Sequence, residues 1–432
     1  MFKGIEVHEL SPNINLYTLK TKQFKTDSVG IFFERPLSNE EASKNAMLAA
    51  VMKRGTQNFP KSRDLYRELD NLYGAVYSSN ISKYGERQII KFQMQFPDSN
   101  YIEDKSIFEK SISMLNEIVN HPFRDGNSFS ENYFEQEKKN QILKLENRIN
   151  NKMAYAFDRC IEEMYKGEPF SVNEDGDARM LDELDGKTLY DHYKNVLMTS
   201  KVDIFIISRN DRNHYAGEIL ESFEFKNQKS KPTPREKHIY PAASPKYVTE
   251  KMDISQGKLV MGFRTNIPYE DSLYRPLLVF NEILGGGTYS KLFQNIREKE
   301  SLCYSIFSTV EKFKSALFVA SGIDFDKKDT VVNLVLEQVE IMKKGYFDEE
   351  DLGNAKKSII SSINSIKDSP NKIMNYYYSR ILTNSYMEAD EIISQFESID
   401  KEMVVKAAEG IFLDTVYFLD EKGELIEENK QG

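Results

Sequence analysis

The sequence is poor in cysteine. It has only two, Cys160 and Cys303, among 432 residues, and they lie in opposite halves of the chain. They are far from a Cys-x-x-Cys spacing, so the sequence offers neither a disulfide framework nor a thiolate metal site. We expect both thiols to be ordinary buried side chains.

Long apolar segments are also missing. The longest apolar runs, such as Ala316 to Ala320, have the length of a strand, whereas a membrane-spanning helix needs about 20 apolar residues. The start of the chain, MFKGIEVHEL, has no apolar stretch behind Lys3 of the kind found in secretion signals. We therefore expect a cytoplasmic protein without a membrane partner.

Positive charge is scarce, because the formal net charge is -10 at pH 7. The one basic cluster, Lys226 to Lys237, is interrupted by Pro232 and Pro234, as a linker would be. An acidic chain repels the phosphate groups of a nucleic acid. The charge balance therefore argues against a nucleic-acid partner.

What the chain has is length and enough apolar residues, 40% of the total, to fill more than one core. The stretch Lys226 to Pro245 concentrates lysine, proline and small residues without an apolar period, which is typical of a linker between domains. It divides the chain into two similar lengths. We predict an N-terminal domain at residues 1–225, a linker at 226–246 and a C-terminal domain at 247–432.

The order of elements before this linker recurs after it. The first half predicts a strand, two helices, two strands and then long helices, and the first helix begins at a capping box of Ser38 and Glu41. The predicted elements are a strand at 28–34, helices from Ser38 to about Arg54 and at 62–73, and strands at 75–82 and 86–95. The second half predicts a strand at 258–264, helices at 272–284 and 290–299, strands at 302–309 and 316–321, and helices over 327–382. The fold class is therefore α+β, with two repeated domains that each have a mostly antiparallel sheet covered by helices on one face.

The chemistry-bearing residues are sparse. None of the five histidines (His8, His121, His192, His214 and His238) lies three or four residues from another, so no helix turn carries a pair of imidazole ligands. We expect surface or capping roles for them. A Gly-x-Ser-x-Gly elbow is absent, and the glycines at 285–287 lack the lysine and hydroxyl of a phosphate-binding loop. Cys303 is better explained as an apolar filler on a strand than as a nucleophile.

One segment carries a family resemblance. Residues 285–304, GGGTYSKLFQNIREKESLCY, resemble the C-terminal signature of M16 (insulinase-type) zinc peptidases, which is a glycine run, a helix, Arg-Glu-Lys and Leu-x-Tyr. The resemblance extends over about residues 10–420. It implies that Arg297 and Tyr304 lie near a zinc-bound peptide, where a guanidinium would hold a carbonyl and a phenol would donate to the oxyanion.

The same resemblance places the metal site in the first half, where active members carry His-x-x-Glu-His on the helix before a Gly-Thr pair. That pair is present as Gly55 and Thr56. Counting back from it gives alanine at both histidine positions and at the general base, and lysine at the third ligand, seven residues after Glu137. These positions are Ala46, Ala50, Ala49 and Lys144. Methyl groups and an ammonium neither coordinate zinc nor accept a proton.

The pattern therefore resembles the subunit of a two-chain M16 peptidase that lacks the zinc motif, such as the α-type processing-peptidase subunit or members associated with elongation factor P modification. It implies no cofactor in this chain, zinc in a homologous partner chain, a peptide substrate, and a clamshell assembly or a homodimer in isolation. A scaffold or binding protein with the same fold would explain the lost ligands equally well. An independent hydrolase is a third reading, without a supporting group of residues.

Overall fold

The computed structural model describes residues 4–215, 217, 219, 223, 233, 236, 240, 244–385 and 387–422. Most of the predicted linker, residues 226–246, and His238 lie outside these residues. The chain forms two compact units. Unit 1 comprises Met1–Asn147, Val172–Arg235 and Ile366–Glu388, and unit 2 comprises Arg148–Ser171, Glu236–Ser365 and Ala389–Gly432. The predicted domains follow the chain without interruption, whereas the units exchange two segments.

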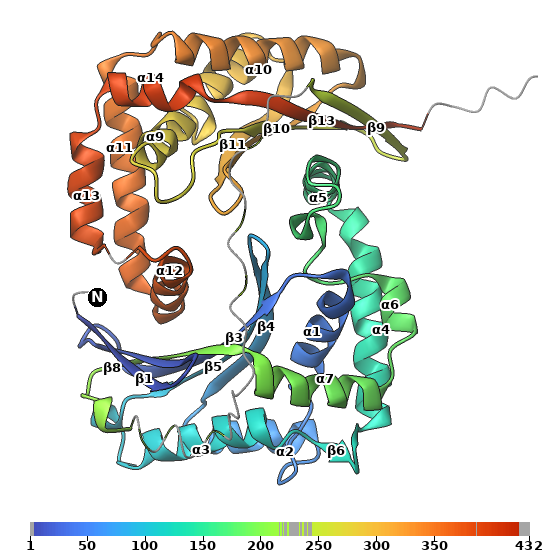
Figure 1. Cartoon of the computed structure of the whole chain (residues 1–432), viewed down its shortest axis with the longest axis vertical. Coiled ribbons are helices and arrows are strands. Elements are labelled where there is room, and N and C mark those ends of the chain that lie inside the picture. Colours follow the sequence, from blue (N-terminus) through green and yellow to red (C-terminus); the bar gives the residue numbers. More distant parts are fainter. Residues whose placement is uncertain are drawn as a thin grey trace, which may run out of the picture. The chain divides into compact units, whose positions relative to one another are not determined.

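Unit 1 is built around a six-stranded sheet in the order β1-β2-β8-β3-β5-β4 (Figure 1). All neighbouring strands are antiparallel except the pair β2 and β8. The strands are β1 (Ile5–Ser11), β2 (Ile14–Lys20), β3 (Thr26–Pro36), β4 (Val76–Tyr84), β5 (Arg87–Pro97) and β8 (Lys201–Ser208), with a separate small hairpin of β6 (Arg124–Asp125) and β7 (Ser128–Phe129).

Helices that lie between these strands in the sequence cover one face of the sheet. Their apolar sides and that face form one core, which includes Phe33, Leu48, Leu65, Leu115 and Val196. On α3 an apolar stripe at helical spacing faces the sheet, whereas α1 is buried on nearly all sides. The helices of unit 1 are α1 (Asn39–Val51), α2 (Ser62–Asn71), α3 (Ile107–Asn120), α4 (Glu131–Asn147), α6 (Ala178–Asp182) and α7 (Gly186–Thr199).

Unit 2 has a five-stranded sheet in the order β11-β12-β10-β13-β9, again antiparallel except for β13 and β9. The strands are β9 (Lys246–Met252), β10 (Gly257–Arg264), β11 (Cys303–Glu311), β12 (Ala316–Ile323) and β13 (Phe412–Glu421). The helices are α9 (Tyr274–Gly285), α10 (Lys328–Lys343), α11 (Glu349–Asn364), α13 (Ala389–Ser398) and α14 (Lys401–Glu409).

The two sheets repeat one topology. Reading β4-β5-β3-β8-β2 in unit 1 against β11-β12-β10-β13-β9 in unit 2 matches strand order, direction and the single parallel pair. β1 is an addition to the first sheet. The predicted α+β fold with two repeated domains is therefore confirmed.

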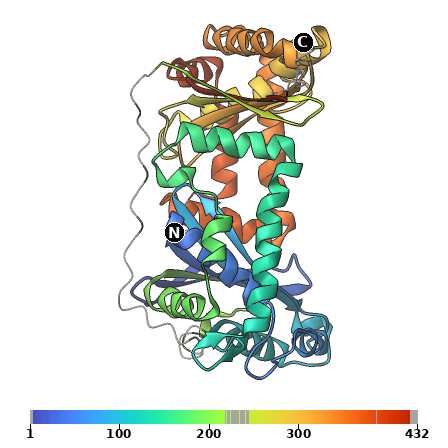
Figure 2. The ribbon, with the colours of Figure 1, turned by 90° about the vertical axis from the view of Figure 1, so that its right-hand side faces the viewer.

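The second face of each sheet is covered by a helix from the other half of the chain, which the sequence did not indicate. Helix α12 (Pro370–Leu382) packs Ile373, Met374, Tyr378 and Ile381 against the sheet of unit 1. Helix α5 (Lys152–Met164) packs Ala156, Cys160 and Met164 against the sheet of unit 2. Figures 1 and 2 show α10 on one face of the unit 2 sheet and α5 on the other. Because both faces are covered, β12 is buried along its whole length.

Polar contacts orient α5 on its sheet. The carboxylate of Glu250 on β9 accepts hydrogen bonds of 2.7 Å from the phenols of Tyr155 on α5 and Tyr417 on β13. The Arg159 guanidinium of α5 donates to the same carboxylate at 3.1 Å. Since one acceptor connects three elements, these bonds fix the position of α5 along the strands in addition to its apolar packing.

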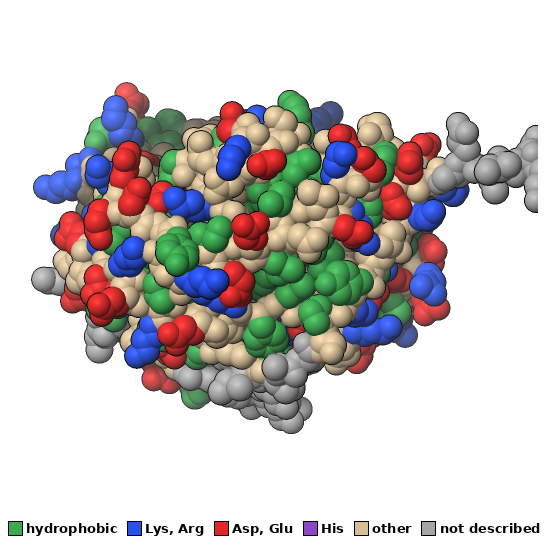
Figure 3. All heavy atoms as spheres, turned by 90° about the horizontal axis from the view of Figure 1, so that it is seen from above, with side chains coloured by type: hydrophobic (Ala, Val, Ile, Leu, Met, Phe, Trp, Pro, Cys, Tyr) green, Lys and Arg blue, Asp and Glu red, His purple; other side chains and the backbone are tan. Residues whose placement is uncertain are grey.

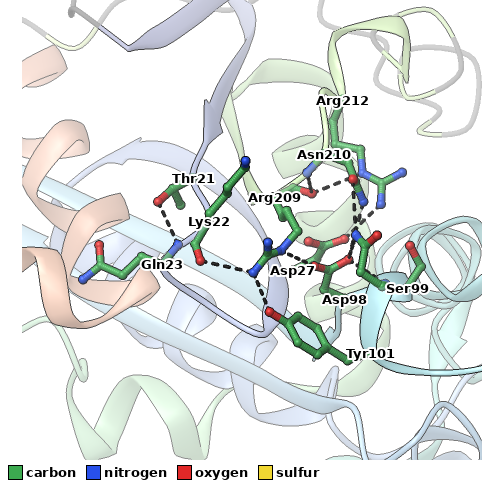
Figure 4. Close-up of polar contacts among 12 residues, drawn as sticks. Thr21, Lys22, Gln23, Asp27, Asp98, Ser99, Tyr101, Arg209, Asn210 and Arg212 are labelled. Carbon is green, nitrogen blue, oxygen red and sulfur yellow. Dashed lines mark hydrogen bonds and ion pairs between the residues drawn. The ribbon is translucent and has the colours of Figure 1, made fainter.

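Buried ion pairs hold the strand ends of unit 1 together (Figure 4). Asp27 begins β3 and accepts from Arg212 at 3.0 Å, and Asp98, just after β5, lies 3.0 Å from Arg209. Both carboxylates are fully buried. Burial raises the pKa of Asp27, although a hydrogen bond from Ser208 and the charge of Arg212 oppose the shift. The segment after β8 is thus fixed to the ends of β3 and β5.

Three local expectations differ from the structure. Ser38 caps α1 by accepting from the Glu41 N–H, but the Glu41 carboxylate binds Arg35 instead of completing a capping box, because a bidentate ion pair is stronger. The helix ends at Val51, not near Arg54. Residues 290–299 were predicted as an α-helix, yet Phe293–Lys299 is a π-helix.

The surface carries charged side chains of both signs, as the composition indicates. On the face seen in Figure 3, acidic and basic side chains are interspersed. Among the described residues, no helix combines the length and the apolar character needed to cross a bilayer.

Lys91 on β5 is a buried lysine beneath α12. Its ammonium donates to the Tyr84 hydroxyl at 2.9 Å and to Asn375 of α12 at 2.7 Å, and it lies 5.1 Å from the centre of the Phe32 ring. No carboxylate of the described residues is within ion-pair distance of it. Burial lowers the pKa of Lys91 to about 7.

We predict a pH-dependent stability from this lysine. Between pH 7 and 10.5 the unfolded chain binds a proton that folded Lys91 has lost, so the stability of the wild type relative to Lys91→Met should rise with pH, by at most about 1.4 kcal/mol per pH unit, and level off below that range. Urea unfolding between pH 6 and 10 measures the difference, with Lys20→Met on β2 as the control for a lost charge. Parallel profiles for wild type and Lys91→Met would contradict the assignment.

Candidate functional site

The predicted metal positions lie on α1 and α4 of unit 1. Ala46 and Ala49 are buried and Ala50 is partly buried on α1, so their methyl groups belong to a packed helix face. Lys144 on α4 points its ammonium at Asp175, 2.6 Å away. Glu137, seven residues earlier on α4, is ion-paired with Arg54 just after α1. Glu137 and Lys144 are therefore both neutralised by a protein partner.

These residues do not fit a zinc ion. Zinc binds thiolate, imidazole or carboxylate groups in a tetrahedral arrangement, and the four positions offer three methyl groups and one ammonium. Glu146, the nearest alternative carboxylate on α4, is exposed. Over the part of the chain that the structure describes, no group of three or more His, Cys, Asp or Glu side chains could hold a metal ion.

Beside these positions lies a buried polar network that sequence reasoning missed. His192 on α7 hydrogen bonds to Asn45 on α1 at 2.7 Å, and Asn45 donates to Gln88 on β5 at 2.7 Å. Burial lowers the pKa of His192 to about 4, so the imidazole is neutral at physiological pH. The expectation of a surface or capping role holds for His121, which caps α3, but is wrong for His192. Residues so far apart in sequence gave no signal of this network.

Arg297 lies on the π-helix Phe293–Lys299 of unit 2. Its side chain is 36% exposed, its guanidinium stacks 4.4 Å from the centre of the Phe293 ring, and its nearest carboxylate, Glu298, is 3.8 Å away. π-Helical turns are rare and occur often at functional sites. The guanidinium therefore has only weak contacts within the described residues and keeps its hydrogen-bonding capacity.

Tyr304 lies at a β-bulge near the start of β11. Cys303 pairs with Ile323 and Ser305 with Gly322, so Tyr304 is an extra residue without a partner on β12. Its side chain is 78% exposed, and no hydrogen bond to a described residue is recorded for its phenol. A bulge commonly redirects a side chain beside a binding site.

The turn between these two residues is also irregular. Ser301 has a φ of 55°, a left-handed conformation that is uncommon for a residue other than glycine. The Leu302 N–H donates to the Ile296 carbonyl at 3.2 Å and closes the turn. Burial raises the pKa of the neighbouring Cys303 thiol, and the charge of Arg297 opposes this shift. The thiol is thus not activated as a nucleophile.

The glycine run has a packing role. Helix α9 ends at Gly285, where a Cβ would lie 2.6 Å from the Ser308 nitrogen on β11. A side chain there would force the helix away from the strand. An open groove of about 620 Å³ lies beside this contact, between α5 and β11, and its lining includes Met153, Phe157 and Phe307.

Comparisons with known proteins agree with this geometry. Residues 184–359 match the family described as Peptidase M16 inactive domain. The chain is 32% identical over 407 residues to a Bacillus subtilis protein named "Probable inactive metalloprotease YmfF", and the match covers 94% of this chain and 95% of that protein. The chain belongs to the M16 peptidase family.

Solved structures support the assignment of the M16 fold. A conserved protein from Enterococcus faecalis superimposes with a TM-score of 0.92 at 25% identity, covering 98% of this chain and all of that one. A peptidase M16 inactive domain from Pseudomonas fluorescens gives a TM-score of 0.78 at 14% identity over 97% and 99% of the two chains, which supports the fold alone.

We predict that this M16 chain purifies without zinc and has no peptidase activity alone, because the predicted ligand positions carry methyl groups and an ammonium. The measurement is metal analysis of tag-free protein together with a peptide-cleavage assay before and after chelation. Stoichiometric zinc, with cleavage that chelation abolishes, would show that the ligand positions have been misassigned.

Proposed function

We propose that this chain is the non-catalytic subunit of a two-chain M16 zinc peptidase. In this proposal a homologous partner carries the zinc ligands and the general base, and this chain contributes Arg297 and Tyr304 to the bound peptide. The names of the relatives, an inactive domain and a probable inactive metalloprotease, support the non-catalytic part. The partner and the contribution in trans are our inference.

The observation that carries the proposal is the state of the Arg297–Tyr304 segment. The π-helix, the left-handed Ser301 and the bulge at Tyr304 are three departures from regular backbone within twelve residues, 293–304. Each has a conformational cost, which a fold tolerates more readily where it serves a site. Ile296 anchors the segment in the core, but Arg297 and Tyr304 are not core side chains, so burial does not explain their positions.

The chemistry of the two side chains suits peptide hydrolysis. When water attacks the scissile carbonyl, negative charge develops on its oxygen, and the Tyr304 phenol would donate a hydrogen bond to that oxyanion. The Arg297 guanidinium would bind a carbonyl or carboxylate of the peptide before and during the reaction. The apolar groove that includes Met153, Phe157 and Phe307 offers room for side chains of an extended peptide.

A scaffold or binding protein is the second candidate. The buried alanines on α1 and the ion pairs of Lys144 and Glu137 favour it, because they make the predicted metal positions a packed region without a free ligand or base. The two candidates differ in one respect: only the accessory subunit needs the Tyr304 phenol. Capture of the native protein from cells, followed by a search for a chain of similar length that contains His-x-x-Glu-His, would identify the partner for this test.

We predict that Tyr304→Phe lowers the turnover of the reconstituted pair by about a hundredfold, or roughly 3 kcal/mol, because the substitution removes an oxyanion donor. Assembly of the pair should be unchanged, since the phenol is exposed. Tyr346→Phe, which changes a similarly exposed tyrosine (68%) elsewhere in unit 2, is the matched control. Wild-type turnover of Tyr304→Phe in an active pair would favour the scaffold.

We predict that Arg297→Ala acts through both KM and kcat, because a guanidinium holds the peptide in the ground state as well as in the transition state. Lys299→Ala, an exposed cation in the same turn, is the control for lost charge. Steady-state kinetics of the pair separate the two constants. Loss of subunit assembly in Arg297→Ala, with unchanged constants in the remaining complex, would mean that the residue has a structural role.

A further inference from the structure

A short segment of unit 1, Val172–Asp177, lies against the residues around the predicted metal positions. We call this segment the strap. Three of its backbone carbonyls accept hydrogen bonds from other elements: Val172 from the Lys83 ammonium at 2.9 Å, Glu174 from Gln88 at 2.6 Å and Asp175 from Gln141 at 3.1 Å. Gln88 and Gln141 are buried. Because their donors have no access to water, opening the strap would leave buried polar groups unpaired.

The strap also contacts α1 directly. The Asp177 N–H donates to the Ser43 hydroxyl at 2.9 Å. Gly176 has a φ of 89°, and a Cβ at this residue would overlap Ser43. Only glycine allows both this backbone conformation and so close an approach. Ser43 is buried beneath this contact.

The position of the strap relative to the predicted metal site follows from helix periodicity. Ser43, Ala46 and Ala50 are spaced three and four residues apart, so they lie on one face of α1. The strap is thus fastened to the face of α1 that would present two metal ligands. Its Asp175 carboxylate is paired with Lys144 on α4, the third predicted ligand position.

We propose that the strap is a built-in closure of the former metal site, and that Lys144 is its latch. In an active enzyme the metal would connect α1 to α4. In this chain the Arg54–Glu137 pair connects them directly, and the strap adds a second connection, through Ser43 on one side and the Lys144–Asp175 ion pair on the other. The closure thus depends on the assignment of the ligand positions but not on any role of Arg297 or Tyr304 in trans.

A second ion pair in unit 1 provides a matched control for the Lys144–Asp175 latch. Lys144 is 56% and Asp175 is 17% exposed, at a distance of 2.6 Å. The pair Lys110–Asp104 is nearly identical in exposure, 55% and 23%, and in distance, 2.7 Å, but connects residues only six apart. Only the first pair can hold a remote segment in place.

The experiment measures thiol labelling of Ser43→Cys in a Cys303→Ser background, where the remaining native thiol, Cys160, is buried. The new thiol lies beneath the strap, so its labelling rate reports the open fraction. We expect slow labelling, accelerated about fivefold by either Lys144→Gln or Asp175→Asn, the loss expected for one partly exposed ion pair. Lys110→Gln should leave the rate unchanged.

Two results would overturn the proposal. Labelling of Ser43→Cys as fast as in urea-unfolded protein would mean that the strap is open, and equal rates in the Lys144, Asp175 and Lys110 variants would mean that the ion pair is no latch. If Ser43→Cys does not fold, limited proteolysis of the otherwise native chain gives the same test. Cleavage within residues 172–177, located by mass spectrometry, should be faster in Lys144→Gln than in Lys110→Gln. Equal cleavage would likewise reject the latch.

Discussion

Each half of this chain forms a sheet with two apolar faces, and the helices that pack on it from the same half cover only one of them. The other face is buried by a helix from the opposite half, α12 on the first sheet and α5 on the second. Each apolar side chain in these contacts contributes roughly 2 kcal/mol. The exchange therefore accounts for a large part of the stability and ties the folding of each unit to residues from both halves of the chain.

The same exchange explains which features the sequence could predict. The repeated order of strands and helices, the glycine run and the helix cap at Ser38 depend on local periodicity and turn chemistry, and the structure contains them. The covering of the second face by α5 and α12 depends on contacts between residues that are 95 and 284 positions apart in the two examples above, Tyr155–Glu250 and Lys91–Asn375, and no local pattern encodes it. For the same reason the His192–Asn45–Gln88 network was invisible, because each residue alone resembles an ordinary polar side chain.

The two candidate sites differ in the regularity of their backbone and in the exposure of their side chains. Around α1 and α4 the structure is regular, with buried methyl groups, Glu137 paired with Arg54 and Lys144 paired with Asp175. Around Arg297 and Tyr304 the backbone is irregular and the side chains are left exposed. The sequence predicted helices at the four metal positions and at Arg297 and a strand at Tyr304, and the structure has them there. It could not predict the π-helix or the bulge, because both arise from backbone hydrogen bonding and not from residue type.

The predicted metal positions show how a region of this kind is stable without a cation. An unpaired buried carboxylate is costly, because its charge has lost its water. Here alanine stands at three of the predicted positions, Arg54 neutralises Glu137, and Lys144, at the fourth, is paired with Asp175. Introducing a single histidine at residue 46 or 50 would place an imidazole against packed methyl groups, beside carboxylates that are already paired with Arg54 and Lys144. Because the predicted ligand positions lie on two helices, we expect that no single substitution would create a zinc site here.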